Sequence, residues 1–420
     1  MEHMAGQLKV GKRFALLFGA MFILVVAVLL RVEYLFYMSF ALAVTPGVAW
    51  LFARRGTLYV EASRSMTGVV KAGERLPMRI ELENTGATRK QLLVMRDTLP
   101  SGLVAEGPSE RFVTDVLPGE MVAVEYPVTA RRRGVYPLGW IDLVCWDPLG
   151  LYTHSRELPA EATLVVHPRP VPLPLVKPPS GGRQFSNRTR ARRRGEGTDF
   201  RGVREYTPGD DLRRIHWKQT AKRQKLTVVE YESGEANNVA VVLDLSPGFH
   251  AGVEDESTLE YGVTLAASIA SQALKRGSEF TLVAECAKSY SLRSLATTED
   301  ETAVMDALAR VRATSASSFA ETLMEAEQWI PPGAGVVVIS PAAGEEVVAS
   351  ATRLSALGHG VLWISLDAGS FAKQTGQKPP ADDLAYEALA TGLVGVRCAV
   401  RQIAQGQDLA TRMGVMVHAG

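Results

Sequence analysis

The chain has 420 residues, a formal net charge of +1, and a composition that is 46% hydrophobic and 22% charged. A chain of this length is too long for a single domain with one hydrophobic core, so we expect two or three domains. The composition is that of a globular protein, which excludes bulk disorder. The near-neutral charge gives no general reason to expect a nucleic-acid partner. The three cysteines (Cys145, Cys286 and Cys398) are far apart and show no metal-site spacing, so we expect reduced, buried thiols in a reducing compartment.

Two apolar stretches predict a transmembrane helical hairpin over residues 1–55. The helices are expected at about 14–30 and 34–52, each close to the roughly 20 residues that cross a bilayer. The first stretch would also suit a signal peptide, but no small-residue cleavage site follows it, so we expect a retained hairpin. Basic residues lie at both ends of the hairpin: Lys9, Lys12, Arg13, Arg54 and Arg55. This bias predicts a multi-pass cell-membrane protein with both termini and the soluble domains in the cytoplasm.

Residues 56–170 predict an antiparallel β-sandwich of immunoglobulin-like type. Met78–Asn84 and Met121–Val128 alternate apolar with other side chains, which is the period of a half-buried strand. Turn signals such as Pro118-Gly119 separate the short runs. Because no Cys–Trp–Cys pattern is present, membership of the antibody-type domains does not follow.

Residues 171–198 predict a linker, because proline and glycine dominate their first half. Their second half contains the arginine-rich run Arg190–Arg194. A solvated connector is the first interpretation, and two others stay open: contact with anionic lipid headgroups, which would make a lipid-sensing module, or docking of an acidic partner. Nucleic acid is not expected, because no aromatic recognition pattern accompanies the arginines.

From residue 236 to 420 buried strands alternate with amphipathic helices. Val239–Leu243 is a continuous apolar run, and Thr258–Lys275 follows it with one apolar helical face. Similar alternation continues to a last strand near Gly395–Val400. The pattern predicts a Rossmann-like α/β domain with a parallel sheet.

Asp244 and Ser246 follow the first of these strands, where ligands bind in open α/β sheets. The stretch resembles the DxSxS start of the von Willebrand factor A metal-ion-dependent adhesion site, which coordinates magnesium. Gly248 replaces the second serine, and Ser340 stands where a later strand end needs an aspartate. We therefore expect a degenerate, metal-free site at Asp244 and Ser246. P-loop, GxGxxG, HExxH and GxSxG motifs are absent, which disfavours nucleotide or hydrolase chemistry.

Residues 199–235 crowd charges, turn residues and aromatics together, and three interpretations are open. As a structural clasp, Asp210 or Asp211 would cap a helix in which Ile215 and Trp217 pack inward. As a partner-binding surface, the segment would use its arginines and Trp217 as anchors. As a catalytic site, His216 would be a base oriented by Asp210 or Asp211, but no nucleophile lies beside them.

This segment resembles the signature of the DUF 58 family, whose pattern is close to DFxxxREYxxGDDxRxIxWxxxAR. The matching positions that we single out as partner-binding or structural residues are Asp199, Phe200, Arg204, Glu205, Tyr206, Pro208, Gly209, Asp210, Arg213 and Trp217. Ile215 and Ala221 match as well, whereas Lys222-Arg223 is a mild departure. Arg131–Leu151 resembles a second family segment, RG.Y.LG…DP.GL, and the resemblance extends over the whole chain.

The resemblance implies a bacterial or archaeal membrane-anchored protein with a von Willebrand A-like C-terminal domain. It implies no catalytic residues and no cofactor. Expected partners are a MoxR-type AAA+ ATPase, a transglutaminase-like membrane protein and the lipid bilayer. The implied role is a non-enzymatic adaptor or assembly factor in envelope-protein maturation or stress response. A membrane-bound hydrolase using Asp210, Asp211 and His216 is the alternative.

Overall fold

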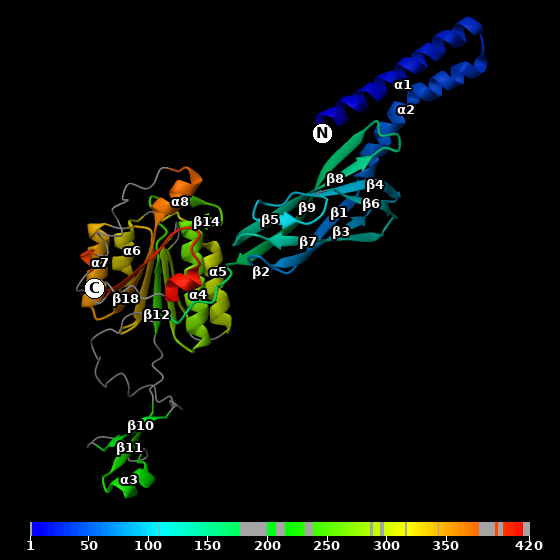
Figure 1. Cartoon of the computed structure of the whole chain (residues 1–420). Coiled ribbons are helices and arrows are strands. Elements are labelled where there is room, and N and C mark those ends of the chain that lie inside the picture. The colour runs from blue at the N-terminus through cyan, green and yellow to red at the C-terminus, as the bar shows by residue number, and fades with distance from the viewer. Residues whose placement is uncertain are drawn as a thin grey trace. The chain divides into compact units, whose positions relative to one another are not determined.

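The computed structural model describes residues 2–108, 110–176, 200–206, 215–231, 238–285, 289–294, 298–315, 317–342, 344–377, 391–393 and 398–414. The chain divides into two compact units, Met1–Pro168 and Arg169–Gly420 (Figure 1). Each unit is described by itself below.

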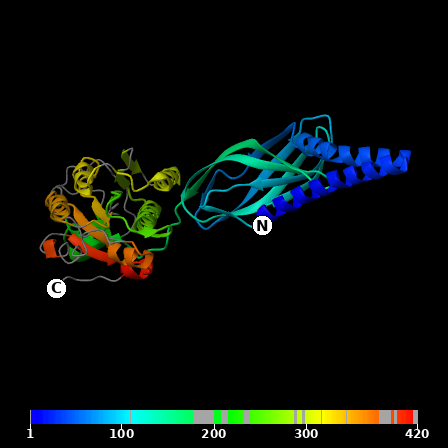
Figure 2. The same ribbon diagram turned by 90° about the horizontal axis from the view of Figure 1, so that it is seen from above.

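The first unit begins with two long helices, α1 (Glu2–Leu30) and α2 (Glu33–Gly56), which lie side by side in both views (Figures 1 and 2). Ser39 Oγ donates a hydrogen bond to the carbonyl of Ala20 at 2.8 Å and joins them. The segments Gly11–Leu30 and Glu33–Gly56 are long and apolar enough to cross a membrane. Both helices extend beyond the predicted ranges, because the polar residues at their ends continue the helical backbone.

The rest of the first unit is built of strands. Their bounds are β1 (Val60–Ser65), β2 (Val69–Lys71), β3 (Arg75–Asn84), β4 (Lys90–Asp97), β5 (Leu103–Ala105), β6 (Glu110–Val116), β7 (Met121–Ala130), β8 (Gly134–Trp146) and β9 (Thr153–His167). Among the described residues they form two sheets with the orders β1-β3-β7-β5 and β2-β9-β8-β4-β6, in which every pairing except β2–β9 is antiparallel.

One apolar core lies between these two sheets. Met78, Ile80 and Leu82 of β3 are completely buried, as their alternation predicts. Burial of each such side chain contributes about 1.5–3 kcal/mol. A polar bridge also joins the sheets: the Arg64 guanidinium donates to Asp97 Oδ1 at 2.6 Å, and the Tyr126 hydroxyl donates to the other oxygen of the same carboxylate. This bridge ties β1 and β7 of one sheet to β4 of the other.

The second unit contains a mixed sheet with helices. Its elements are β12 (Val239–Leu243), β13 (Gly252–Val253), β14 (Glu256–Ser257), α4 (Thr258–Lys275), β15 (Phe280–Glu285), β16 (Ser289–Ser294), α5 (Thr298–Arg310), α6 (Phe319–Ala326), β17 (Gly335–Ser340), α7 (Glu345–Ala356), β18 (Gly360–Leu366), α8 (Ala368–Thr375), β19 (Cys398–Ile403) and α10 (Leu409–Gly414). The strand order in the described part is β16-β15-β12-β17-β18-β19, a doubly wound order in which β16 alone runs antiparallel.

Two cores cover the two faces of this sheet. On one face the sheet packs against α4 and α5, and on the other against α6 and α7. The predicted linker 171–198 is described only as far as Val176, and these residues lie along α4. Val171 N donates to Ser268 Oγ at 2.9 Å, and Val176 is buried in the first core. The start of the predicted linker is therefore part of the folded unit.

Candidate functional site

The described part of the signature segment folds into two strands and a short helix. Strand β10 (Phe200–Glu205) pairs antiparallel with β11 (Thr227–Tyr231), and a bulge interrupts the register between Phe200 and Gly202. Helix α3 (Trp217–Arg223) lies between the strands in sequence. The C-cap residue Gln224, which follows the helix, has the left-handed φ of 51°; this ends the helix and returns the chain toward β11.

Contacts with β11 fix the start of α3. Ile215 is 8% exposed and forms a bridge with Val228, and His216 N donates to Thr227 O at 2.8 Å. His216 Nδ1 then accepts a hydrogen bond from Gln219 N at 3.2 Å, so His216 is the N-cap. The expected cap at Asp210 or Asp211 is therefore wrong for this helix, which begins six or more residues later than those aspartates.

Trp217 points to solvent. Ile215 packs inward as expected, but the same expectation was wrong for Trp217, whose surface is 68% exposed. Lys218 and Lys222 are exposed on the same helix. Lys225 forms an exposed ion pair with Glu205 at 2.9 Å. The described part of the segment thus exposes an aromatic ring and several lysine side chains to solvent.

Several predicted signature residues lie outside the described residues. These are Asp199, Pro208, Gly209, Asp210, Asp211 and Arg213, while Phe200 and Arg204 are described by their backbone alone. Of the predicted set, the structure describes Glu205, Tyr206 and Trp217 with their side chains; Tyr206 N donates to Leu226 O at 2.8 Å.

The second predicted site lies at the carboxyl end of β12. Asp244 has no exposed surface, and both of its carboxylate oxygens accept hydrogen bonds. Ser246 N donates to Oδ1 at 2.9 Å, and Ser340 Oγ, at the end of the neighbouring strand β17, donates to Oδ2 at 2.5 Å. The structure therefore brings Asp244, Ser246 and Ser340 together, as the ends of adjacent parallel strands predict.

His250 completes this buried cluster and had no signal in the sequence. Its Nε2 lies 3.0 Å from the Asp244 carbonyl, which can only accept, so Nε2 carries the proton and Nδ1 faces Thr258 Oγ1 at 2.9 Å. Burial raises the pKa of the Asp244 carboxyl, and the charge of His250 and the Ser340 hydroxyl oppose that shift. Burial likewise lowers the pKa of His250.

The donors around Asp244 do not fit a magnesium ion. Magnesium prefers six oxygen ligands, with one or more free carboxylates among them. Here the single carboxylate is already occupied by two protein donors. Ser315 lies next to the site, since its N donates to Leu245 O at 3.1 Å, whereas Ser317 Oγ donates to Glu285. Over the described residues, no group of three or more His, Cys, Asp or Glu side chains could hold a metal.

A cavity of about 240 Å³ lies elsewhere in the second unit. Its lining includes Glu260 and Tyr261 of α4 and Asp408 and Leu409 near the start of α10. It contains no residue of the signature and none of the Asp244 cluster. It is also too small and too polar for an apolar ligand pocket of ordinary size.

Comparison with known proteins connects the chain to one family. Residues 202–367 match the family model described as "Protein of unknown function DUF58". "Uncharacterized protein YeaD" of Bacillus subtilis (strain 168) is 23% identical over 260 residues, which cover 58% of this chain and 60% of YeaD. The matched part therefore spans less than two thirds of that relative's length.

Solved structures resemble the chain weakly. The CARDB domain of the PF1109 protein from Pyrococcus furiosus is 12% identical with a TM-score of 0.18, covering 26% of this chain and 94% of that one. A cohesin module from a Clostridium perfringens family 33 glycoside hydrolase is 10% identical with a TM-score of 0.19, covering 27% and 100%. Likenesses at these TM-scores carry no argument about this chain. The resemblance to the DUF 58 signature is confirmed instead by the family model, which matches residues 202–367.

Proposed function

We propose that this chain is a membrane-anchored, non-enzymatic adaptor that docks a cytoplasmic AAA+ ATPase of MoxR type through its signature segment. The exposed ring of Trp217 carries the proposal. Most of the apolar surface of Trp217 is in contact with water, and burying it against a partner would be favourable by several kcal/mol. Tryptophan is also among the side chains that contribute most to binding energy at interfaces.

The apolar helices supply the membrane anchor in this proposal. Tyr34 and Tyr37 are exposed near the tip of the hairpin, and Trp50 is exposed near its other end. Tyrosine and tryptophan favour both membrane–water interfaces, so these positions suit a hairpin that crosses the bilayer twice. Arg54 and Arg55 end α2 on the side of the soluble domains, which favours a cytoplasmic location for them.

The finer fold assignments belong to the same proposal. An immunoglobulin-like sandwich suits the two packed sheets of the first unit, and a von Willebrand A-like domain suits the doubly wound sheet of the second. The Asp244 cluster then corresponds to a ligand position that has lost its metal. A buried carboxylate with two protein donors acts as a brace between β12 and β17.

The role that we propose is assembly rather than chemistry. The ATPase would act on envelope proteins, with a transglutaminase-like membrane protein as a further partner, in maturation or stress response. A hydrolase that uses Asp210, Asp211 and His216 is less well supported, because His216 Nδ1 already caps α3. The lipid-sensing alternative depends on Arg190–Arg194, which lie outside the described residues.

Capture of the ATPase from native membranes tests the adaptor role. The full-length tagged chain is extracted in mild detergent with ATP and magnesium, and bound proteins are identified by mass spectrometry. We expect an AAA+ ATPase with the natural chain and with Trp329→Ala, a control at a 49% exposed tryptophan outside the signature, but a loss of at least tenfold with Trp217→Ala.

Two results would contradict the proposal. Equal capture by Trp217→Ala would remove the docking role from α3. Absence of any AAA+ ATPase with the natural chain would remove the adaptor function itself.

A further inference from the structure

Helix α2 joins the β-sheets of the first unit through fixed contacts. The Lys90 ammonium donates to the carbonyl of Arg55 at 2.9 Å, and the Arg156 guanidinium donates to the carbonyl of Thr57 at 3.2 Å. Gly56 lies against the Cys145 side chain, where a Cβ would collide with the sulfur. The last turn of α2 is therefore held on β4, β8 and β9.

Helix α1 is held by the turn between β8 and β9, residues 147–152. Arg13 Nε donates to the carbonyl of Leu151 at 2.7 Å, and its guanidinium lies 3.8 Å from the centre of the Tyr152 ring. Asp147 fixes the turn by accepting from Leu149 N at 2.9 Å and from Tyr152 N at 2.6 Å. Arg13 is the last charge before the apolar run of α1, so this turn lies at the depth where that run begins.

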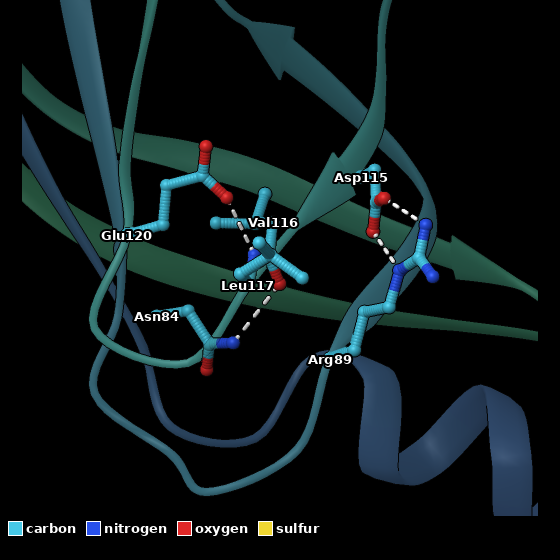
Figure 3. A network of polar contacts seen from close by, with 6 residues as sticks. All are labelled: Asn84, Arg89, Asp115, Val116, Leu117 and Glu120. Carbon is cyan, nitrogen blue, oxygen red and sulfur yellow. Dashed lines mark hydrogen bonds and ion pairs between the residues drawn. The ribbon is translucent and has the colours of Figure 1, made fainter.

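Two further loops lie at the same end of the β-sheets. Thr85 N donates to the carbonyl of Tyr59, which follows α2, and Gly119 N donates to the carbonyl of Asn84. The loop at 117–120 is held by Asn84 Nδ2, which donates to the carbonyl of Val116 at 3.1 Å, as Figure 3 shows. Glu120 accepts from Leu117 N at 2.7 Å in the same network.

These loops expose apolar side chains next to basic ones. Tyr59 is 67% exposed, Leu117 51% and Leu149 54%. The exposed basic residues at this end include Lys12, Arg54 and Arg55, whereas the exposed Arg89 is paired with Asp115. Apolar tips set among lysine and arginine are the composition of surfaces that rest on anionic lipid, because the tips enter the interface while the cations meet phosphate.

We propose that this end of the first unit is a second membrane-binding surface, in which Tyr59, Leu117 and Leu149 enter the headgroup layer and Lys12, Arg54 and Arg55 bind anionic lipid. The inference depends on the insertion of the hairpin proposed above. Because α1 and α2 are both fixed to the β-sheets, the apolar runs and these loops are presented to the bilayer together. The DPLGL segment, Asp147–Leu151, then fixes α1 to the β-sheets through the hydrogen bond between Arg13 and the Leu151 carbonyl.

Fluorescence quenching by spin-labelled lipids tests this surface in the full-length protein. Leu149→Cys and Val104→Cys are labelled with an environment-sensitive dye and placed in nanodiscs of phosphatidylcholine and phosphatidylglycerol. Val104 is the matched control, since it is 40% exposed but lies away from the proposed surface. It pairs with Thr129, at the opposite end of β7 from Met121, which follows the loop at 117–120. The parent chain labelled in parallel gives the contribution of its own cysteines. Insertion of the hairpin is scored separately, by resistance to extraction at alkaline pH.

We expect several-fold stronger quenching at residue 149 than at residue 104, and stronger quenching by labelled phosphatidylglycerol than by labelled phosphatidylcholine. The paired changes Arg54→Gln and Arg55→Gln should abolish that lipid preference. Equal quenching at the two positions in an inserted protein would overturn this inference alone, and an unchanged lipid preference in the paired variant would overturn its electrostatic part. A hairpin that is extracted would overturn both the inference and the membrane anchor.

Discussion

Each unit contains an aspartate side chain that is almost fully buried, and the two are held in different ways. Asp97 of the first unit accepts from the Arg64 guanidinium and the Tyr126 hydroxyl, so a positive charge lies beside it. Asp244 of the second unit accepts from a backbone amide and from the Ser340 hydroxyl. Removing a carboxylate that is paired with a buried cation is costly, because the cation is left buried without a partner. A buried carboxylate whose donors are neutral has a raised pKa instead, because burial disfavours its charged form. The first aspartate is therefore a structural bridge, and the second is a titrating brace.

The largest effect should follow from Asp97→Ala. The change leaves the Arg64 guanidinium buried without its carboxylate, and breaking a buried pair in this way costs about 3–5 kcal/mol. Hydrogen exchange of peptides from β3 and β7 measures the loss within the first unit. Glu125→Ala is the control, because it removes a surface ion pair with Arg79 and should cost less than about 1 kcal/mol. Equal losses in the two variants would show that Arg64 finds another partner or water.

A smaller, pH-dependent effect should follow from Asp244→Asn. Burial raises the pKa of this carboxyl in the folded state, so between the unfolded value of about 3.9 and the raised folded value the folded state binds more protons. The stability of the natural protein therefore falls as the pH rises through that window. The amide does not titrate, so the variant should gain stability relative to the natural protein as the pH rises from about 4 through the raised pKa of the folded state.

Urea unfolding of the second unit, followed by pulse proteolysis at several pH values, measures this difference. The lowered pKa of His250 acts in the opposite direction, because its stabilisation is lost as the pH falls through and below the unfolded value of about 6.5. The Asp244 charge raises the pKa of His250, so the variant has a still lower His250 pKa, and this change adds to the rise of the variant's relative stability with pH. A stability difference that does not change with pH would show that Asp244 is not titrating in the folded state.

The smallest effect should follow from Lys225→Ala in the signature segment. Its ion pair with Glu205 is exposed on both sides, 67% and 65%, so water and salt screen it. A double-mutant cycle with Glu205→Ala should give a coupling energy below about 1 kcal/mol that decreases with added salt. A larger, salt-independent coupling would mean that this pair holds the segment together, which would favour the clasp over the partner surface.

The regular elements could largely be predicted because their apolar period is strong. Helix α4 has the bounds of the predicted Thr258–Lys275, and Met78, Ile80 and Leu82 face the core as predicted. Strand β16 is not predicted, because SYSLRS lacks an apolar run; in the described sheet it lies at one edge and pairs with β15. The last strand ends at Ile403, three residues after the predicted end, because its end is set by its pairing with β18 rather than by its composition; residues 395–397 of the prediction lie outside the described residues.

The candidate sites were less predictable, since they depend on contacts that are distant in sequence. The meeting of Asp244 with Ser340 follows from adjacent parallel strands, and the sequence indicates it. The carbonyl contact of His250 depends on how the chain turns after β12, which no periodic pattern encodes. The clasp interpretation places Trp217 inside and the partner-surface interpretation exposes it; the sequence leaves this choice open, and the structure exposes the ring.

The packing of α2 against the β-sheets also determines the reactivity of the Cys145 thiol. Cys145 is a free thiol with no exposed surface, and its burial raises its pKa to about 11. Only the thiolate reacts readily with alkylating or oxidising reagents, so this thiol is inert while Gly56 stays against it. Movement of α2 away from the β-sheets would expose the sulfur and let it ionise. The rate at which Cys145 is alkylated therefore measures whether α2 stays packed against the sheets of the first unit.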